Sequence, residues 1–100
     1  MFFVYILASC RNGTLYIGMT DNLARRMSQH IAGAVPGFTR KYHVNQLVWF
    51  EQHDTRESAF IRERQPKKWN RAWKLRLIEE ANPTWRDLVG EIGSLSPNSA

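Results

Sequence analysis

The sequence predicts an α+β domain whose elements follow the order strand–strand–helix–strand–helix–helix. Residues 2–9 are rich in Phe, Val, Tyr and Ile, as strands are, and the Asn-Gly pair at 12–13 is a strong hairpin signal that leads into a second strand over 14–20. Apolar residues then recur four apart between residues 23 and 31, which indicates an amphipathic helix. A third strand-like run, 46–52, precedes segments with helical patterns, so strands and helices belong to one small fold.

The predicted hairpin places two tyrosines on one face of the sheet. A two-residue Asn-Gly turn would pair Ser9 with Tyr16 and Tyr5 with Thr20. Because side chains alternate with a period of two, Tyr5, Tyr16 and Gly18 share a face, and any turn of even length keeps them together. A glycine inside a strand indicates close approach by another backbone or a ligand. The opposite face is entirely apolar and is the predicted core side; it holds Phe2, Val4, Ile6, Ala8, Leu15, Ile17 and Met19.

Capping residues and helix breakers delimit the predicted helices. The first begins near residue 22 with Thr20 or Asp21 as its cap, and the second follows a cap at Asp54 or Thr55. Pro66 should kink or end that second helix. A third helix is expected over 67–81, and a short helical turn over 84–88 closes the fold. The predicted buried stripes are Leu23, Met27 and Ile31 in the first helix and Trp69, Trp73, Leu77 and Ile78 in the last, with Trp85 also in the core.

Composition indicates one globular domain. The chain has 100 residues, of which 43% are hydrophobic and 12% aromatic, and this excludes a disordered protein. One cysteine and three dispersed histidines exclude a disulfide scaffold and a zinc motif. We expect a folded domain over 1–90 and a flexible tail over 91–100, in a cytoplasmic protein without a membrane span. The run 7–10 has the form of a lipoprotein cleavage box, but its apolar lead is short and carries no basic start.

Basic residues are concentrated in the segment 62–76, which holds seven Lys or Arg and a single acid, Glu63. The chain as a whole carries 14 basic against nine acidic residues, a formal net charge of +5. Such a cluster fits a phosphate-binding surface, and it is equally typical of a solvated helix face. A lone carboxylate among cations either binds a divalent metal or forms an ion pair.

The spacing of these residues resembles the GIY-YIG nuclease superfamily, and in particular its short stand-alone bacterial members. The stretch from Leu15 to Leu23, followed by Arg25-Arg26 and His30, is similar to the central motif of that superfamily. The first motif departs from the pattern, because Phe3 and Val4 stand where the family name has Gly and Ile. The resemblance extends from residue 2 to about residue 88 and includes 38–42 and 82–88.

The resemblance implies a three-stranded antiparallel sheet flanked by helices and metal-dependent hydrolysis of nucleic-acid phosphodiesters with Mg²⁺ or Mn²⁺. By position, Tyr16 matches the tyrosine that activates or orients the attacking water, and Tyr5 matches its partner. Arg26 would stabilise charge on the phosphate, His30 lies where many members have a His or Tyr near the site, and Glu63 matches the protein ligand of the metal.

Five further basic residues are predicted to bind the nucleic acid: Arg25, Arg40, Lys41, Lys67 and Lys68. DNA is favoured over RNA as the substrate, with low or structure-based specificity and a role in DNA repair, and the oligomeric state is open. Two alternatives remain. One is a nucleic-acid-binding module that does not cleave, and the other is an interaction domain with neither activity. Pro66 bears on this choice, because a ring clash with the carbonyl of Arg62 would move Glu63. Asn82 is a further polar candidate near the site.

Overall fold

The computed structural model describes residues 1–33, 37 and 41–95, so Arg40 lies outside the described residues. The predicted α+β order is confirmed, with a short helix at its end. The elements are β1 (Phe2–Ala8), β2 (Leu15–Thr20), α1 (Leu23–Ile31), β3 (Gln46–His53), α3 (Arg56–Lys67), α4 (Arg71–Ala81) and a 3-10 helix, η1 (Leu88–Leu95).

The three strands form an antiparallel sheet in the order β2-β1-β3, with β1 in the centre. The predicted pairing within the hairpin is wrong by two residues, since Tyr5 lies opposite Gly18 and Leu7 lies opposite Tyr16. The cause is a four-residue turn over residues 10–13, which the Gly13 N–H closes by donating to the Cys10 carbonyl at 2.9 Å. A shift of two residues leaves every side chain on its predicted face, so the face assignment stands.

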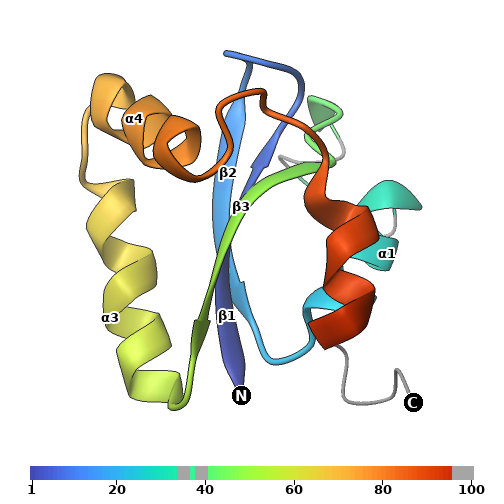
Figure 1. Ribbon diagram of the computed structural model, residues 1–100, viewed down its shortest axis with the longest axis vertical. Coiled ribbons are helices and arrows are strands. Elements are labelled where there is room, and N and C mark those ends of the chain that lie inside the picture. The colour runs from blue at the N-terminus through green and yellow to red at the C-terminus, as the bar shows by residue number, and fades with distance from the viewer. Residues whose placement is uncertain (34–36, 38–40, 96–100) are drawn as a thin grey trace.

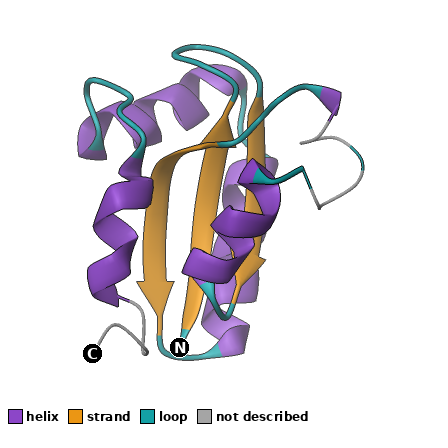
Figure 2. Ribbon diagram, turned by 90° about the vertical axis from the view of Figure 1, so that its right-hand side faces the viewer, coloured by secondary structure: helices purple, strands orange, loops and turns teal. Residues whose placement is uncertain are grey.

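Helices cover both faces of this sheet. Figure 1 shows α3 and α4 on one side of the strands, with α1 and η1 on the other, and Figure 2 looks at the sheet from the side of α1. Val4, Ile6 and Ala8 pack under α3 and α4, whereas Phe3 and Leu7 pack under α1 and η1. The prediction of a single core face is therefore wrong, and the face that carries the two tyrosines is also buried. The continuous apolar run of β1 is the sequence signal of a strand covered on both sides.

Each α-helix begins at a side chain that caps its first turn. Asn22 caps α1 by accepting from the Arg25 N–H at 3.0 Å, and Thr20 instead accepts from the Asn22 N–H. Thr55 caps α3 as predicted, and Asn70 caps α4, which starts at residue 71 rather than 67. Within the described residues, no helix has the length and apolar character that crossing a membrane requires.

The buried stripes differ from the prediction in both helices, and two of the predicted stripe residues, Trp69 and Leu77, are only partly buried. In α1, Leu23 and Met27 are buried, but Ile31 is exposed and His30 takes the third buried position. In α4, Ile78 is buried, whereas Trp73 is 57% exposed and its ring packs edge-on against Trp69.

The C-terminal segment is folded further than predicted. Trp85 is buried in the core, as expected, but the helical turn comes later, at 88–95. Ile92 is buried against the core beneath α1, and the 3-10 helix continues to Leu95. Residues 91–95 therefore belong to the folded domain, which was expected to end at residue 90 and to be followed by a flexible tail. The rest of the predicted tail, 96–100, lies outside the described residues.

Candidate active site

Three aromatic rings from three elements meet at one point of the structure. Tyr5 lies at the centre of β1, Tyr16 in the edge strand β2, and His30 near the end of α1. The centroid of the Tyr5 ring is 6.4 Å from that of Tyr16 and 6.0 Å from that of His30, and Tyr16 and His30 are 5.8 Å apart. The Tyr5 hydroxyl lies 3.3 Å from His30 Nε2, within hydrogen-bonding distance. The structure thus brings together three of the five residues predicted to be catalytic.

Gly18 makes the position of the Tyr5 ring possible. An added Cβ at Gly18 would lie 2.5 Å from the Tyr5 hydroxyl oxygen and 2.6 Å from its Cζ, both well inside van der Waals contact. It would also lie 3.1 Å from Cε2 of Tyr16. Gly18 is closely approached, but by the phenol of its cross-strand partner Tyr5 rather than by another backbone or a ligand as predicted.

Burial keeps the Tyr5 phenol and the His30 imidazole uncharged at neutral pH. Tyr5 is only 2% exposed, and burial raises the pKa of its phenol far above the ordinary value, with smaller upward effects from Tyr16 and Glu63. Burial also lowers the pKa of His30, and the nearby Arg26 guanidinium lowers it further. Arg26 acts in the opposite sense on Tyr5, whose pKa it lowers. The Arg26 charge thus lies within electrostatic range of both rings.

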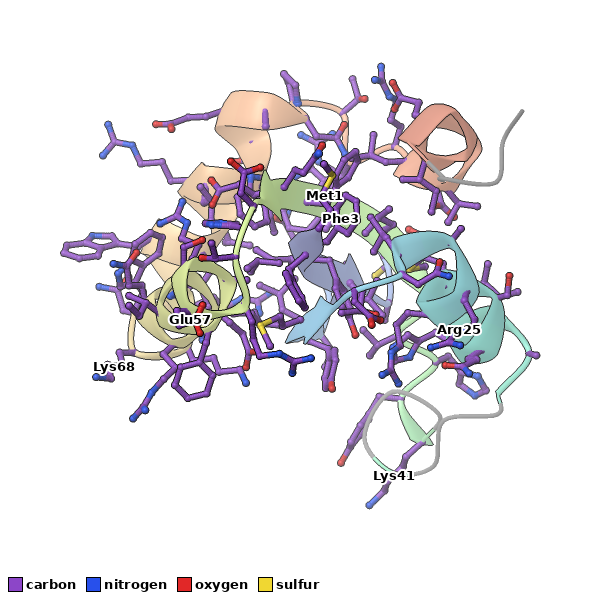
Figure 3. The ribbon with its side chains drawn as sticks, turned by 90° about the horizontal axis from the view of Figure 1, so that it is seen from below. Met1, Phe3, Arg25, Lys41, Glu57 and Lys68 are labelled. Atoms are coloured by element: carbon purple, nitrogen blue, oxygen red, sulfur yellow. The ribbon has the colours of Figure 1, made fainter. Side chains whose placement is uncertain are left out.

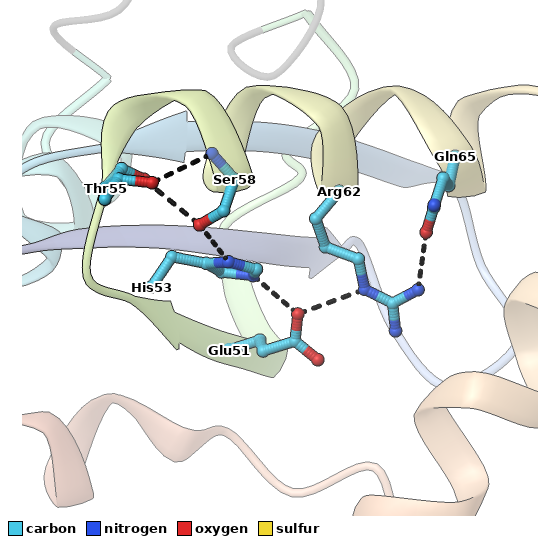
Figure 4. A network of polar contacts seen from close by, with 6 residues as sticks. All are labelled: Glu51, His53, Thr55, Ser58, Arg62 and Gln65. Atoms are coloured by element: carbon cyan, nitrogen blue, oxygen red, sulfur yellow. Dashed lines mark hydrogen bonds and ion pairs between the residues drawn. The ribbon is translucent and has the colours of Figure 1, made fainter.

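Glu63 comes to this region on α3, whose position depends on its neighbour Arg62. Arg62 Nε donates to Glu51 of β3 at 3.0 Å, and the same guanidinium donates to Gln65. Glu51 in turn contacts His53 Nε2 at 2.7 Å, and His53 reaches Ser58 in the first turns of α3 (Figure 4). This network fastens α3 to β3 along its length. Arg62 is therefore part of the scaffold rather than of a phosphate-binding surface.

Pro66 does not displace Glu63 from the helix. The proline is buried in the last turn, and α3 ends at Lys67, one residue beyond it, so the predicted helix end is confirmed. Glu63 lies inside the helix, mostly buried, and affects the Tyr5 phenol electrostatically. Its carboxylate forms an ion pair with the Lys67 ammonium one turn later.

One carboxylate is a sparse donor set, but it fits a magnesium-type ion. Among the described residues there is no cluster of three or more His, Cys, Asp or Glu side chains that would form an all-protein metal cage. Mg²⁺ is usually bound through one or two carboxylates, several waters and substrate phosphates. A single carboxylate such as that of Glu63 matches that pattern.

The residues predicted to bind nucleic acid divide into two groups. Arg25 at the start of α1 and Lys41 lie on one side of the molecule in Figure 3, and Lys68 lies on the opposite side at the end of α3. All three side chains are exposed. Lys67 is also exposed, in part, but it is held by Glu63.

The sequence reasoning missed the roles of two residues, a structural one for Arg71 and a place beside Tyr16 for Lys74, because the basic run looks uniform in sequence. Arg71 donates two hydrogen bonds to the hairpin turn, to the carbonyls of Asn12 and Gly13, at 2.5 and 2.6 Å. Lys74 lines a groove together with Tyr16. The sequence contains no signal that separates these two from their neighbours, because only the tertiary structure decides what each cation faces.

Asn82 has a structural role. It is 3% exposed, and its amide donates to the carbonyls of Val48 and Arg86 at 3.0 and 2.9 Å. It also accepts from the Arg86 N–H, so every polar atom of its side chain is used in joining β3 to the C-terminal segment. None of these hydrogen bonds joins Asn82 to Tyr5, Tyr16 or His30.

Several known proteins have sequences or structures similar to this chain. A UPF0213 protein of Natronomonas pharaonis is 40% identical over 78 residues, which are 78% of this chain and 91% of that protein. A UPF0213 protein of Staphylococcus saprophyticus is 35% identical over the same length, 94% of its own chain. The NMR structure of a UPF0213 protein from Bacillus halodurans superposes with a TM-score of 0.55 at 28% identity, covering 87% of this chain and 93% of that one.

The family match covers the strands and helices that hold the site. The model of the GIY-YIG catalytic domain matches residues 1–76, a range that includes both tyrosines, Arg26, His30 and Glu63. The chain therefore belongs to the GIY-YIG catalytic-domain family, a family of nucleases.

Proposed function

We propose that the protein is a divalent-metal-dependent endonuclease that hydrolyses phosphodiester bonds of DNA, with Tyr5, Tyr16, Arg26, His30 and Glu63 as its reaction centre. The observation that carries this proposal is the convergence of the two tyrosines and His30 within 6.4 Å of one another, with the Arg26 charge acting on Tyr5 and His30. Phosphoryl transfer depends mainly on positioning and on neutralising charge around the phosphate. Membership of the nuclease family supports the same reaction class.

The environment of each ring suggests a different task. Tyr5 is deeply buried and its pKa is raised, so it stays protonated and acts as a hydrogen-bond donor rather than as a base. Tyr16 is only partly buried and borders a surface groove, which makes it the ring that can meet the attacking water. A neutral His30 has one donor and one acceptor nitrogen, so it can hold the Tyr5 hydroxyl in a fixed direction.

Arg26 and Glu63 provide the charges that the reaction needs. A guanidinium can donate to two phosphate oxygens at once, which is the geometry that stabilises a crowded phosphate. Glu63 would be the protein ligand of the cation, in competition with Lys67. When bound there, a divalent ion would neutralise phosphate charge and make a bound water more acidic.

The test is cleavage by the purified chain of a panel of supercoiled, single-stranded and branched DNA and of RNA in the presence of Mn²⁺. We expect cleavage of DNA that is lost with EDTA, in Glu63→Gln and in Arg26→Ala. Glu57→Gln is a matched control, because this exposed carboxylate lies in the first turn of the same helix. Cleavage that persists in Glu63→Gln would overturn the proposal.

The same panel decides the main alternative, a module that binds nucleic acid without cutting it. The Lys67 ammonium on Glu63 is the observation that favours this alternative, since it occupies the carboxylate that a cation would need. Salt-sensitive binding of DNA with no cleavage in any divalent ion would establish the alternative.

A further inference from the structure

A groove of about 330 Å³ lies beside the edge strand β2, and one of the three rings, Tyr16, is among its lining residues. Leu15, Tyr16 and Ile17 of β2 line it together with Lys67 of α3 and Lys74 of α4. Its lining residues thus include two lysines and no acid. Tyr16 belongs both to this groove and to the ring cluster, so whatever occupies the groove lies next to the proposed reaction centre.

Two of the elements that line the groove, β2 and α4, are fixed to each other by Arg71. This residue is the first of α4, and its guanidinium donates to the carbonyls of Asn12 and Gly13 in the β1–β2 turn. The turn leads directly into β2, and Lys74 follows Arg71 by one helical turn. The two hydrogen bonds of Arg71 therefore fix the start of α4, and with it the backbone of Lys74, relative to β2.

The two lysines are in different states. Within the described part of the chain, the Lys74 ammonium makes no ion pair, so its charge is available to the groove. The Lys67 side chain is about half exposed, and its ammonium is paired with Glu63 one turn earlier in α3. Because the Lys67 end of this pair is open to solvent, a competing cation or anion can reach the pair and separate it.

We propose that this groove binds the phosphodiester backbone of the nucleic acid strand next to the reacting phosphate. Lys74 contacts the strand whether or not a metal cation is bound, and Lys67 contacts it only when Glu63 releases its ammonium group. The inference rests on the proposed function, because it places the strand beside Tyr16. Two lysines without an acid select a polyanion, and the outer edge of β2, which no described strand covers, can add backbone N–H donors. When Glu63 engages a metal cation, Lys67 is released to the strand, so cation and strand bind cooperatively and reciprocally.

The first experiment measures the salt dependence of binding without any divalent ion. Affinity of the full chain for a short fluorescent single-stranded DNA is measured by anisotropy in EDTA from about 50 to 200 mM salt. Removing one phosphate contact should reduce the slope of log affinity against log salt by about 0.7. We expect that loss in Lys74→Met and not in Arg76→Met. Arg76 is a matched control because it lies on the same helix, carries the same charge and pairs with Glu80 away from the groove. Equal slopes in the two variants would overturn the proposal.

The second experiment tests the control of Lys67 by Glu63, again in EDTA. Glu63→Gln removes the partner of Lys67, so the slope should become steeper by about 0.7, the contribution of one additional phosphate contact. In a Lys67→Met background the same substitution should leave the slope unchanged, although it still removes a negative charge. A steepening of equal size in both backgrounds, or in neither, would refute the role of Lys67. Failure of the wild type to cleave DNA in Mn²⁺ would overturn the proposed function instead, and the slopes would still decide the groove.

Discussion

Replacing Gly18 by alanine tests the packing on which the whole site depends. The residue lies in an extended strand without a positive φ angle, so alanine meets no backbone strain there. The effect is purely steric, because the new Cβ would lie 2.5 Å from the Tyr5 hydroxyl oxygen. Ordinary contact begins near 3.4 Å, so the phenol must move by about 0.9 Å. The ring is 2% exposed and surrounded by core side chains, which leaves little room for that movement.

The expected cost follows from this clash. Overpacking a core of this kind destabilises by about 1–3 kcal/mol, which for a domain of this size lowers Tm by roughly 4–24 °C. The movement of the phenol also matters for catalysis, since a misplacement of about 1 Å can reduce a rate on the order of 100-fold. We therefore expect Gly18→Ala to show both a lower free energy of unfolding in urea and a greatly reduced rate of DNA cleavage.

Two comparisons isolate the cause. Gly90→Ala should be nearly neutral, because a Cβ at Gly90 has nothing within 4 Å. In a Tyr5→Leu background, which lacks the clashing atoms, Gly18→Ala should cost less by about 0.5–3 kcal/mol than in the wild type. A Gly18→Ala protein whose unfolding free energy lies within about 0.5 kcal/mol of the wild type would refute the account of the Tyr5 position.

Four further substitutions test three other parts of the structure. The pKa of His30 is lower in the folded protein than in the unfolded chain, so the unfolded chain takes up the proton first as the pH falls. The free energy of unfolding that is present above about pH 6.5 should therefore decrease as the pH drops through the folded-state pKa, at up to about 1.4 kcal/mol per pH unit. His30→Gln should lack this component in urea titrations at about pH 7.5 and 5.5, and an identical pH dependence in both proteins would contradict the assignment. Asn82→Ala should reduce the free energy of unfolding by about 1–3 kcal/mol, because its backbone partners lose their hydrogen bonds, and the folded variant should cleave DNA as the wild type does. A stable variant that no longer cleaves would instead place Asn82 in the site. Trp85→Ala should reduce the free energy of unfolding by about 3–5 kcal/mol, whereas substitution of the exposed Trp73 by alanine should reduce it by less than about 1.5 kcal/mol. An equal decrease of Tm in the two variants would refute the difference in burial of the two rings.

Periodicity in the sequence was enough to place Tyr5, Tyr16 and Gly18 on one face. That result survived a wrong turn length, because strand side chains alternate with a period of two and the error was an even number of residues. What the pattern did not reveal is how closely the phenol of Tyr5 approaches Gly18. The pairing depends on the turn, and the turn over residues 10–13 is longer than its Asn-Gly pair predicts.

Burial of the tyrosine face was predictable only in part. Phe3 and Leu7 alternate with Tyr5 in β1 and are apolar, which is consistent with a covered face, but the apolar side of the hairpin gave the stronger signal. The cover is η1 together with α1, and it depends on Ile92, in a segment whose sequence resembles a loose tail. The shift in the pKa of Tyr5 follows from this cover and therefore had no signal in the sequence.

The sequence by itself determined the order of elements, the faces of the strands and the family motif, because local periodicity and capping chemistry depend on residues close together in the chain. Only the tertiary structure decided which cations of the segment 62–76 are available. Arg62 is tied to Glu51, Arg71 to the hairpin turn and Lys67 to Glu63, whereas Lys74 faces a groove. The partner of a long charged side chain is set by what packs within a few ångströms of its end, and that neighbourhood is assembled from strands and helices far apart in the chain.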